Sequence, residues 1–329
     1  MVTRKHGGPA AARCGTGPFR HVRRTAPVAL PGPGSGRRGP AGGAGRGYYG
    51  VGALTVAIRL IGIDVDGTLL DTGGRLPEAN LDAIHDAVAA GIHVALVTGR
   101  SYPFARPVAE PLPAAVTLIV SNGAVERAMD GTVIARRLLD RTVARQVLDS
   151  TRSYREAAAL IFDRDEAGQV VFESMDWELP ARKAYWLRNR RLIEKSVPLE
   201  EALVEDPIQV MFNGGVDAMQ ALGEALQREA RDYAVSLTEY RHRDFSLLDI
   251  TAPSATKGRA LAWRARQLGL DRDEVMAVGD NFNDLEMLEF AGIPVVMANA
   301  VDSLKQRGWH VTGHQDEGGL GQAIRRFAL

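Results

Sequence analysis

Short apolar runs, each closed by a polar loop, constrain the fold of this chain more than any other feature. The runs are largely hydrophobic, and the loops after them are rich in Asp, Asn, Thr and Gly. Strands that are buried on both faces have this continuous pattern, as in a parallel sheet covered by helices. The runs span residues 58–63, 93–97, 116–120, 274–279 and 293–297. A helical stretch, PEANLDAIHDAVAAG, separates the first two, so the order strand, helix, strand predicts an α/β domain.

The segment between residues 125 and 250 has a different pattern. Short alternating runs such as TVIARR, ALIFD, QVVFE and FSLLDI are interleaved with helical stretches. This pattern indicates a second, mixed α+β domain. Residues 251–329 return to alternating strands and helices, so we expect residues 58–124 and 251–329 to form one core domain around an inserted domain at 125–250.

The first 50 residues are rich in Gly, Pro, Ala and Arg and lack any apolar period, so we expect 1–50 to be a disordered basic tail. A transit-like peptide, a nucleic-acid-binding arm, and a translated upstream stretch with the true start near Val51 or Val56 are the alternatives. The prolines and glycines disfavour the amphipathic helix of a transit peptide. We favour the mis-assigned start.

Charge and cysteine content limit the kinds of partner and the cell compartment that we expect for this chain. Residues 1–57 carry nine Lys and Arg and no acid, which leaves 31 basic and 40 acidic side chains in the rest, a net charge of −9. An acidic body argues against nucleic acid as its partner, because binding a phosphate backbone needs clustered cations. The single cysteine, Cys14, cannot form an intramolecular disulfide, which fits a reducing compartment and predicts a cytoplasmic location. No apolar run approaches the roughly 20 residues that span a bilayer, so we expect no membrane partner. The sequence does not indicate an oligomeric state.

Two carboxylates, Asp64 and Asp66, directly follow the first apolar run in the motif DVDGT. Open α/β sheets bind ligands at the carboxyl ends of their strands, which is where this loop is predicted to lie. A calcium loop is disfavoured, because DVDGTLLDT lacks the alternating acids before the Gly and the later Glu that such a loop needs. An Asx-rich turn remains the alternative.

The second run ends in Thr98 and Gly99, and Lys257 precedes a later helical stretch. A hydroxyl and exposed backbone N–H groups at a strand end can hold phosphate oxygens, and a lysine can add a compact positive charge. A Thr-Gly turn and a solvent-facing lysine are the simpler interpretations.

A third group of polar residues, in the motif GDNFND, follows the run at 274–279. Asp280, Asn283 and Asp284 offer hard oxygen atoms, the ligands that suit Mg²⁺. Asp and Asn are also good helix caps, and one loop can serve both purposes.

Four motifs have now been described: DVDGT, Thr98 with Gly99, Lys257, and GDNFND. Together they resemble the motifs of the haloacid dehalogenase-like hydrolase superfamily, in the Cof-type subgroup. The resemblance covers residues 58–329. It implies a Rossmann-like parallel-sheet core with an inserted α+β cap of the C2 type, a Mg²⁺ cofactor, and a small phosphorylated metabolite as substrate. The segment 247–258 departs from the subgroup, because it lacks the Gly that often precedes the motif lysine.

The resemblance also implies roles for individual residues. Asp64 corresponds to the nucleophile and a metal ligand. Asp66 corresponds to the general acid and base, and its backbone carbonyl to a metal ligand. Asp280 corresponds to the direct metal ligand of the last motif, and Asp284 to an acid that acts through water or by orienting its neighbours. The phosphate-binding group corresponds to Val65, Thr98, Gly99, Lys257 and Asn283.

The predicted function is therefore a Mg²⁺-dependent phosphatase, a phosphoric monoester hydrolase, that works through a phospho-aspartate. A phosphomutase or phosphotransferase is an alternative, because the same intermediate can pass its phosphoryl group to a sugar hydroxyl. A non-catalytic binding protein that keeps the fold is a further alternative. We expect such a protein to lose a motif acid or the lysine, whereas Asp64, Asp66, Lys257 and Asp280 are all present.

Overall fold

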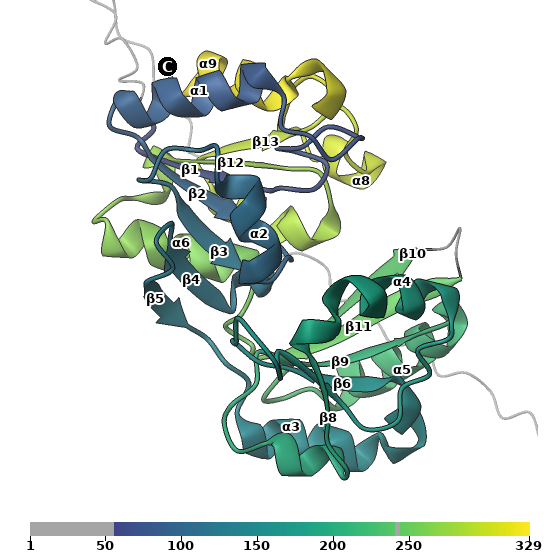
Figure 1. Cartoon of the computed structure of the whole chain (residues 1–329). Coiled ribbons are helices and arrows are strands. Elements are labelled where there is room, and N and C mark those ends of the chain that lie inside the picture. The colour runs from purple at the N-terminus through teal and green to yellow at the C-terminus, as the bar shows by residue number, and fades with distance from the viewer. Residues whose placement is uncertain (1–55, 241–243) are drawn as a thin grey trace, which may run out of the picture. The chain divides into compact units, whose positions relative to one another are not determined.

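The computed structural model describes residues 56–240 and 244–329. The predicted disordered tail, the proposed start near Val51, and Cys14 lie outside these residues. The described residues form two sheets with helices on both faces of each (Figure 1). None of the helices in this part of the chain is both long and apolar enough to cross a membrane.

The larger sheet has eight strands in the order β14-β13-β12-β1-β2-β3-β4-β5. Neighbours from β14 to β3 pair in parallel, and β4 and β5 extend that edge as an antiparallel meander. The strands are β1 (Leu60–Ile63), β2 (His93–Val97), β3 (Thr117–Val120), β4 (Val125–Ala128), β5 (Val133–Arg136), β12 (Val275–Gly279), β13 (Ile293–Val296) and β14 (His310–Val311). All five predicted apolar runs thus form strands of this sheet, and the predicted α/β class is confirmed.

Both faces of the central strands of this sheet are covered, which explains why these strands are largely apolar along their whole length. In β1, Ile61 and Ile63 pack into one hydrophobic cluster while Leu60 packs into another on the opposite face. The helices that bury the first face are α1 (Glu78–Ala89), α2 (Tyr102–Ala109) and α9 (Gly319–Phe327), and those on the second are α6 (Lys257–Gln267), α7 (Leu285–Phe290) and α8 (Asp302–Lys305).

The smaller sheet has six strands in the order β10-β11-β9-β6-β7-β8. All pairs are antiparallel except β7 with β8, so it is a mixed sheet. The strands are β6 (Ala158–Ile161), β7 (Val170–Phe172), β8 (Ile193–Lys195), β9 (Gln209–Gly214), β10 (Ala234–Tyr240) and β11 (Phe245–Thr251). Its sequence lies between β5 and α6 of the larger sheet's domain, as expected for an insertion.

The two faces of the smaller sheet differ. Alternate residues such as Phe212 and Leu248 pack into a hydrophobic cluster with helices α3 (Arg141–Ser150) and α5 (Val216–Glu229). We call the opposite face of the smaller sheet its inner face. Helix α4 (Pro180–Asn189) contacts it (Figure 1). The inner-face residues of β6 and β7 join the hydrophobic cluster of the larger sheet.

The start of the insertion differs from the sequence-based limit. Strands β4 and β5 lie in the segment predicted to belong to the inserted domain, 125–250, yet both pair in the larger sheet. The chain reverses after β3 at Asn122, which has a φ of 54°, and so returns along the same sheet edge. Strands at a sheet edge that is covered on one face alternate apolar and polar residues, and so do the strands of a mixed domain. The sequence pattern alone therefore cannot distinguish the two cases. We therefore propose that the insertion begins after β5; the other limits stay predictions.

Candidate active site

Three of the predicted motif loops lie at one edge of the larger sheet. Asp64, Thr98 and Asp280 each directly follow a strand, namely β1, β2 and β12. These strands are neighbours in the order β12-β1-β2 and are parallel, so their carboxyl ends meet at the same edge. The fold thus brings together residues that are more than 200 positions apart in the chain.

Lys257 joins this group from the start of α6. The Thr256 hydroxyl accepts a hydrogen bond from the backbone N–H of Arg259 and caps the helix, which sets Lys257 in its first turn. The Lys257 side chain is only 1% exposed. Its Nζ donates to Asp64 Oδ1 at 2.5 Å and to Asp284 Oδ1 at 2.7 Å. Lys257 is therefore a buried bridge between two motif carboxylates and not a solvent-facing lysine.

Asp284 holds both the lysine and the metal-motif loop in place. Its Oδ2 accepts hydrogen bonds from the backbone N–H groups of Asp280 at 2.9 Å and Asn281 at 3.0 Å, and the residue is fully buried. The helix-cap interpretation of this loop is also correct, because Asn281 and Asp284 form a capping box. This arrangement supports the predicted orienting role of Asp284.

The carboxylates of Asp64, Asp280 and Asp284 form a compact acidic group, with one oxygen of each within 4.8 Å of the others. Burial, followed by the charge of Asp284, raises the pKa of Asp64 well above its ordinary value and that of Asp280 to about 6. Burial opposes the charge of Lys257, but Asp284 and Asp64 outweigh it and raise the pKa of the lysine. Two buried acids and one half-buried acid thus lie around a single ammonium group, which leaves excess negative charge.

This donor set fits Mg²⁺. The ion prefers carboxylate oxygens, usually takes one or two of them, and keeps several waters. A dication would also offset the excess negative charge that raises the pKa values of Asp64 and Asp280. The residues present therefore support a Mg²⁺ site with Asp64 and Asp280 as side-chain ligands.

Gly67 allows the DVDGT loop to approach the acidic group closely. Its φ is +93°, and a Cβ at this position would lie 2.6 Å from Asp280 Cγ. We expect Gly67→Ala to weaken Mg²⁺ binding at least about tenfold, because the methyl group displaces a ligand, and to cost about 1–2 kcal/mol through backbone strain. Isothermal titration calorimetry with Mg²⁺ measures the first effect, and chemical denaturation measures the second.

Gly74→Ala is the matched control for this prediction. Gly74 has a φ of +73°, but a Cβ there would meet nothing within 4 Å. The control shares the backbone strain and lacks the clash, so it should lose stability and keep its affinity for Mg²⁺. Equal Mg²⁺ affinities of the two variants would contradict the proposed place of Asp280 in the metal site.

Asp66 has an environment unlike that of Asp64. Its side chain is 61% exposed, whereas that of Asp64 is 7% exposed. The guanidinium group of Arg100 donates to both oxygens of Asp66, from Nη2 at 2.6 Å and from Nε at 2.8 Å. Arg100 thus bridges the first two motif loops. One acid is thus buried beside a lysine and the other is accessible to water.

The other predicted phosphate-binding residues line the same loops. Val65 is fully buried, and the Thr98 hydroxyl accepts a hydrogen bond from the backbone N–H of Arg100 at 3.1 Å. A Cβ on Gly99 would lie 3.1 Å from Asn122 Oδ1, and Asn283 Nδ2 donates to the same Asn122 oxygen at 3.5 Å. The assignment of these side chains to a bound phosphate stays a prediction.

Two contacts of the site were not predicted from the sequence. Thr68 Oγ1 donates to Asp280 Oδ1 at 3.3 Å, and Asn299 Nδ2 donates to the Gly67 carbonyl oxygen at 2.8 Å. Thr68 belongs to DVDGT, and Asn299 follows the fifth apolar run. The position of a polar residue just after a buried strand was the available signal for Asn299.

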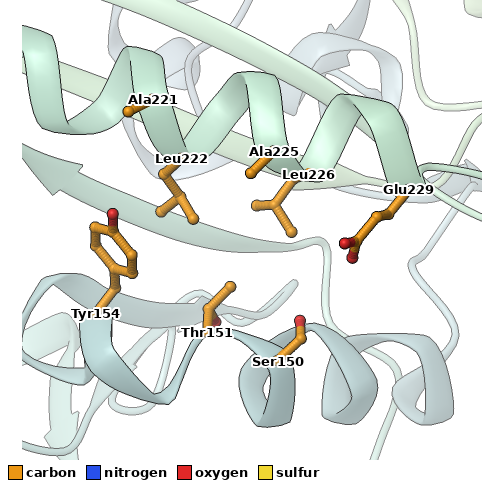
Figure 2. A pocket seen from close by; sticks show the side chains of 8 residues that line it. All are labelled: Ser150, Thr151, Tyr154, Ala221, Leu222, Ala225, Leu226 and Glu229. Atoms are coloured by element: carbon orange, nitrogen blue, oxygen red, sulfur yellow. The ribbon is translucent and has the colours of Figure 1, made fainter. Parts of the chain in front are cut away.

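A separate hollow of about 230 Å³ lies within the inserted domain (Figure 2). Figure 2 shows it between α5 and the segment that contains the end of α3 and the turn after it. Two of its residues, Leu222 and Leu226, also belong to the hydrophobic cluster under α3 and α5. Its lining residues are Ser150, Thr151, Tyr154, Ala221, Leu222, Ala225, Leu226 and Glu229. The hollow thus lies on the face of the smaller sheet opposite its inner face.

Comparison with known proteins decides the family. Residues 61–324 match the haloacid dehalogenase-like hydrolase family. The chain belongs to this family. The predicted Cof-type subgroup and the predicted enzyme class, a phosphoric monoester hydrolase, are confirmed.

Individual relatives agree with this assignment over nearly their whole length. The putative phosphatase YxeH of Bacillus subtilis is 30% identical over 287 residues, which cover 82% of this chain and 98% of that protein. The 5-amino-6-(5-phospho-D-ribitylamino)uracil phosphatase YcsE of Bacillus subtilis is 26% identical over 83% of this chain and 97% of its own. Among solved structures, the phosphatase BT1666 of Bacteroides thetaiotaomicron has a TM-score of 0.70 at 24% identity, covering 85% of this chain and 99% of that one. This last likeness concerns the fold, and it includes the inserted domain.

Proposed function

We propose that this protein is a Mg²⁺-dependent phosphatase that hydrolyses a small phosphorylated metabolite through a phospho-aspartate at Asp64. One observation carries the proposal: a buried lysine bridges Asp64 and Asp284, and Asp280 lies within reach of the same point. This arrangement combines a carboxylate nucleophile with positive charge for the transferring phosphoryl group. Bound Mg²⁺ would add further charge stabilisation beside Asp64 and Asp280.

In the first step, an oxygen of Asp64 attacks phosphorus and the bond from phosphorus to the ester oxygen breaks. Asp66 gives its proton to the departing oxygen, so the alcohol leaves neutral. In the second step, water attacks the phospho-aspartate, Asp66 takes a proton from that water, and inorganic phosphate leaves with Asp64 restored. The separate environments of the two acids suit these roles, because Lys257 lowers the pKa of Asp64 against the effect of burial and bound Mg²⁺ would favour its charged form further, while Asp66 is accessible to solvent.

A panel of phosphorylated sugars, polyols and p-nitrophenyl phosphate, assayed with Mg²⁺ and with EDTA, tests the proposal. We expect release of inorganic phosphate with Mg²⁺ and its loss with EDTA. Phosphate release that EDTA leaves unchanged would overturn the metal-dependent mechanism. An excess of free sugar in the same assay distinguishes hydrolysis from transfer, because a transferase would place the phosphate on the added sugar.

Other predictions about the setting of this enzyme remain proposals. A small phosphoester is the proposed partner, and nucleic acid is not expected to bind the acidic body. We also propose a cytoplasmic location, because a chain with one cysteine cannot form an intramolecular disulfide and this fits a reducing compartment.

A further inference from the structure

A second hollow of the inserted domain, of about 540 Å³, is lined by three arginines and three acids. Its volume lies within the range of small-molecule binding sites, about 300–1,000 Å³. Helix α3 and the 3₁₀ helix after it, Arg152–Ala157, supply the arginines, and the residue after β7 and the turn Leu199–Ala202 supply two of the acids. The charged lining residues are Arg145, Asp149, Arg152, Arg155, Glu173 and Glu200. We call this site the arginine hollow.

The arginine hollow is distinct from the two sites described above. Its lining residues all belong to the inserted domain, and none of them belongs to the motif loops of the active site. Other residues of the same chain segment, namely Ser150, Thr151 and Tyr154, line the hollow beside α5 instead (Figure 2). The segment that joins α3 to β6 thus contributes to two separate hollows, of which this one is charged.

The guanidinium groups of the arginine hollow have unused donors. A guanidinium group carries five N–H donors and no acceptor. Arg155 Nη1 is buried, yet it has no hydrogen-bond partner in the part of the chain that the structure describes. Arg145 donates from Nη2 to the Glu200 backbone oxygen at 3.0 Å, and among the described residues it forms no ion pair. Leaving a buried donor unpaired is unfavourable, so an acceptor bound in the hollow would stabilise this arrangement.

The acids of the arginine hollow hold the arginines in position. Asp149 Oδ1 accepts a hydrogen bond from Arg152 Nη2 at 2.7 Å, and the Glu200 carboxylate accepts one from Arg155 Nη2. On the other side, Glu173 Oε2 lies 3.7 Å from Arg155 Nε. Arg155 is therefore fixed between two carboxylates while its Nη1 stays unpaired. A side chain that is already fixed loses little conformational entropy when a ligand binds.

Arg164, in the same domain, shows how an arginine with a purely structural role differs. Its Nε donates to Glu205 Oε1 at 2.9 Å, and its Nη2 lies 2.7 Å from the same oxygen. Its Nη1 donates to the Gly168 carbonyl oxygen at 3.2 Å, and the guanidinium group lies 4.5 Å from the centre of the Phe162 ring. All three nitrogens of Arg164 thus have partners, whereas Arg155 leaves one nitrogen buried and unpaired. The contrast indicates that Arg155 serves a ligand.

We propose that the arginine hollow is a binding site, separate from the active site, for a small metabolite that carries an oxyanion group, either a carboxylate or a phosphate. Arg145 and Arg155 both contact Glu200, which brings their two guanidinium groups together, and their free N–H groups donate to the oxyanion. A planar guanidinium group matches two oxygens of a carboxylate or a phosphate. The three arginines and three acids have a formal net charge of zero. Recognition therefore depends on directed hydrogen bonds and not on a general excess of positive charge.

Isothermal titration calorimetry of the full chain in EDTA, with succinate in one arm and inorganic phosphate in the other, tests this proposal. We expect one-to-one binding of at least one probe, and the probe that binds identifies the oxyanion group. Arg145→Gln should lower this affinity about tenfold or more, because it removes a charge-assisted hydrogen bond. Phosphate that binds at the active site is distinguished by the same variant, since Arg145 is not part of that site.

Arg141→Gln is the matched control. Arg141 lies on the same helix and also donates to a backbone oxygen, that of Val204 at 2.7 Å, but it does not line the hollow. Its substitution should leave the affinity unchanged. Far-UV circular dichroism checks that both variants fold, and if Arg145→Gln does not, Arg152→Gln tests the same hollow at a side chain that is 75% exposed.

Three outcomes would overturn the inference. They are the absence of binding of both probes to the wild type, equal affinities of the wild type and Arg145→Gln, and an equal loss of affinity in Arg141→Gln. Each of these outcomes leaves the proposed phosphatase function intact, because that function is measured by Mg²⁺-dependent release of phosphate. Arg145→Gln should hydrolyse p-nitrophenyl phosphate at the wild-type rate when succinate is absent.

Discussion

Asp64→Asn is expected to lower kcat by about 10⁴-fold or more while the protein stays folded. Loss of a nucleophile that forms a covalent intermediate has effects of this order, because the residual rate comes only from binding and electrostatic stabilisation. Asparagine has nearly the same shape, and Lys257 keeps its second partner, Asp284, at 2.7 Å. The fold opposes the charge of Asp64, as its raised pKa shows, so removing that charge should not lower stability greatly.

Two measurements check this expectation. Steady-state assays with Mg²⁺ give the loss of kcat, and acid quenching with labelled substrate should trap a phosphorylated aspartate in the wild type and none in the variant. Asp82→Asn is the control, because Asp82 lies exposed on α1 and should leave the rate unchanged. Appreciable Mg²⁺-dependent phosphatase activity in Asp64→Asn would show that another group is the nucleophile.

Much of the site could be predicted because its residues lie directly after buried strands. Asp64, Thr98 and Asp280 follow apolar runs, and parallel strands place their carboxyl ends at one edge regardless of their distance in sequence. The helix that begins at Lys257 was also readable from its pattern. The sequence could not predict that this lysine is buried between two acids, because its position in the sequence is equally compatible with a side chain that faces solvent.

Other features depended on tertiary contacts that carry no local signal. The pairing of Arg100 with Asp66 joins two loops and follows only from the adjacency of β1 and β2. The placement of β4 and β5 in the larger sheet depends on a reversal of the chain at Asn122. The short segment Ser121–Gly123 does not by itself predict this reversal. Asp249 is buried in β11. The sequence could not predict this burial, because the Leu and Ile on either side of Asp249 do not show what packs against each face of the strand.

Lys257→Met is expected to destabilise the metal-free protein by about 3–5 kcal/mol at neutral pH. The substitution leaves the carboxylates of Asp64 and Asp284 buried without a cation, and stranding one half of a buried ion pair has costs of this size. Lys257 lowers the pKa of Asp64, so without the lysine the folded-state pKa of Asp64 rises further above its value in the unfolded chain. Between the two values the folded protein binds more protons, so stability falls as pH rises and recovers as pH falls. The deficit should therefore be larger at pH 7.5 than at pH 5.

Chemical denaturation of the wild type and the variant at both pH values, with EDTA and with Mg²⁺, measures this dependence. Mg²⁺ should restore part of the lost stability, because it binds the folded acids and supplies the missing positive charge. Lys195→Met is the matched control, since Lys195 lies exposed on β8, and its stability should match that of the wild type at both pH values. If Lys257→Met were as stable as this control at pH 7.5 in EDTA, the acids would not depend on the lysine for their charge. The electrostatic role assigned to Lys257 beside the nucleophile would then be wrong.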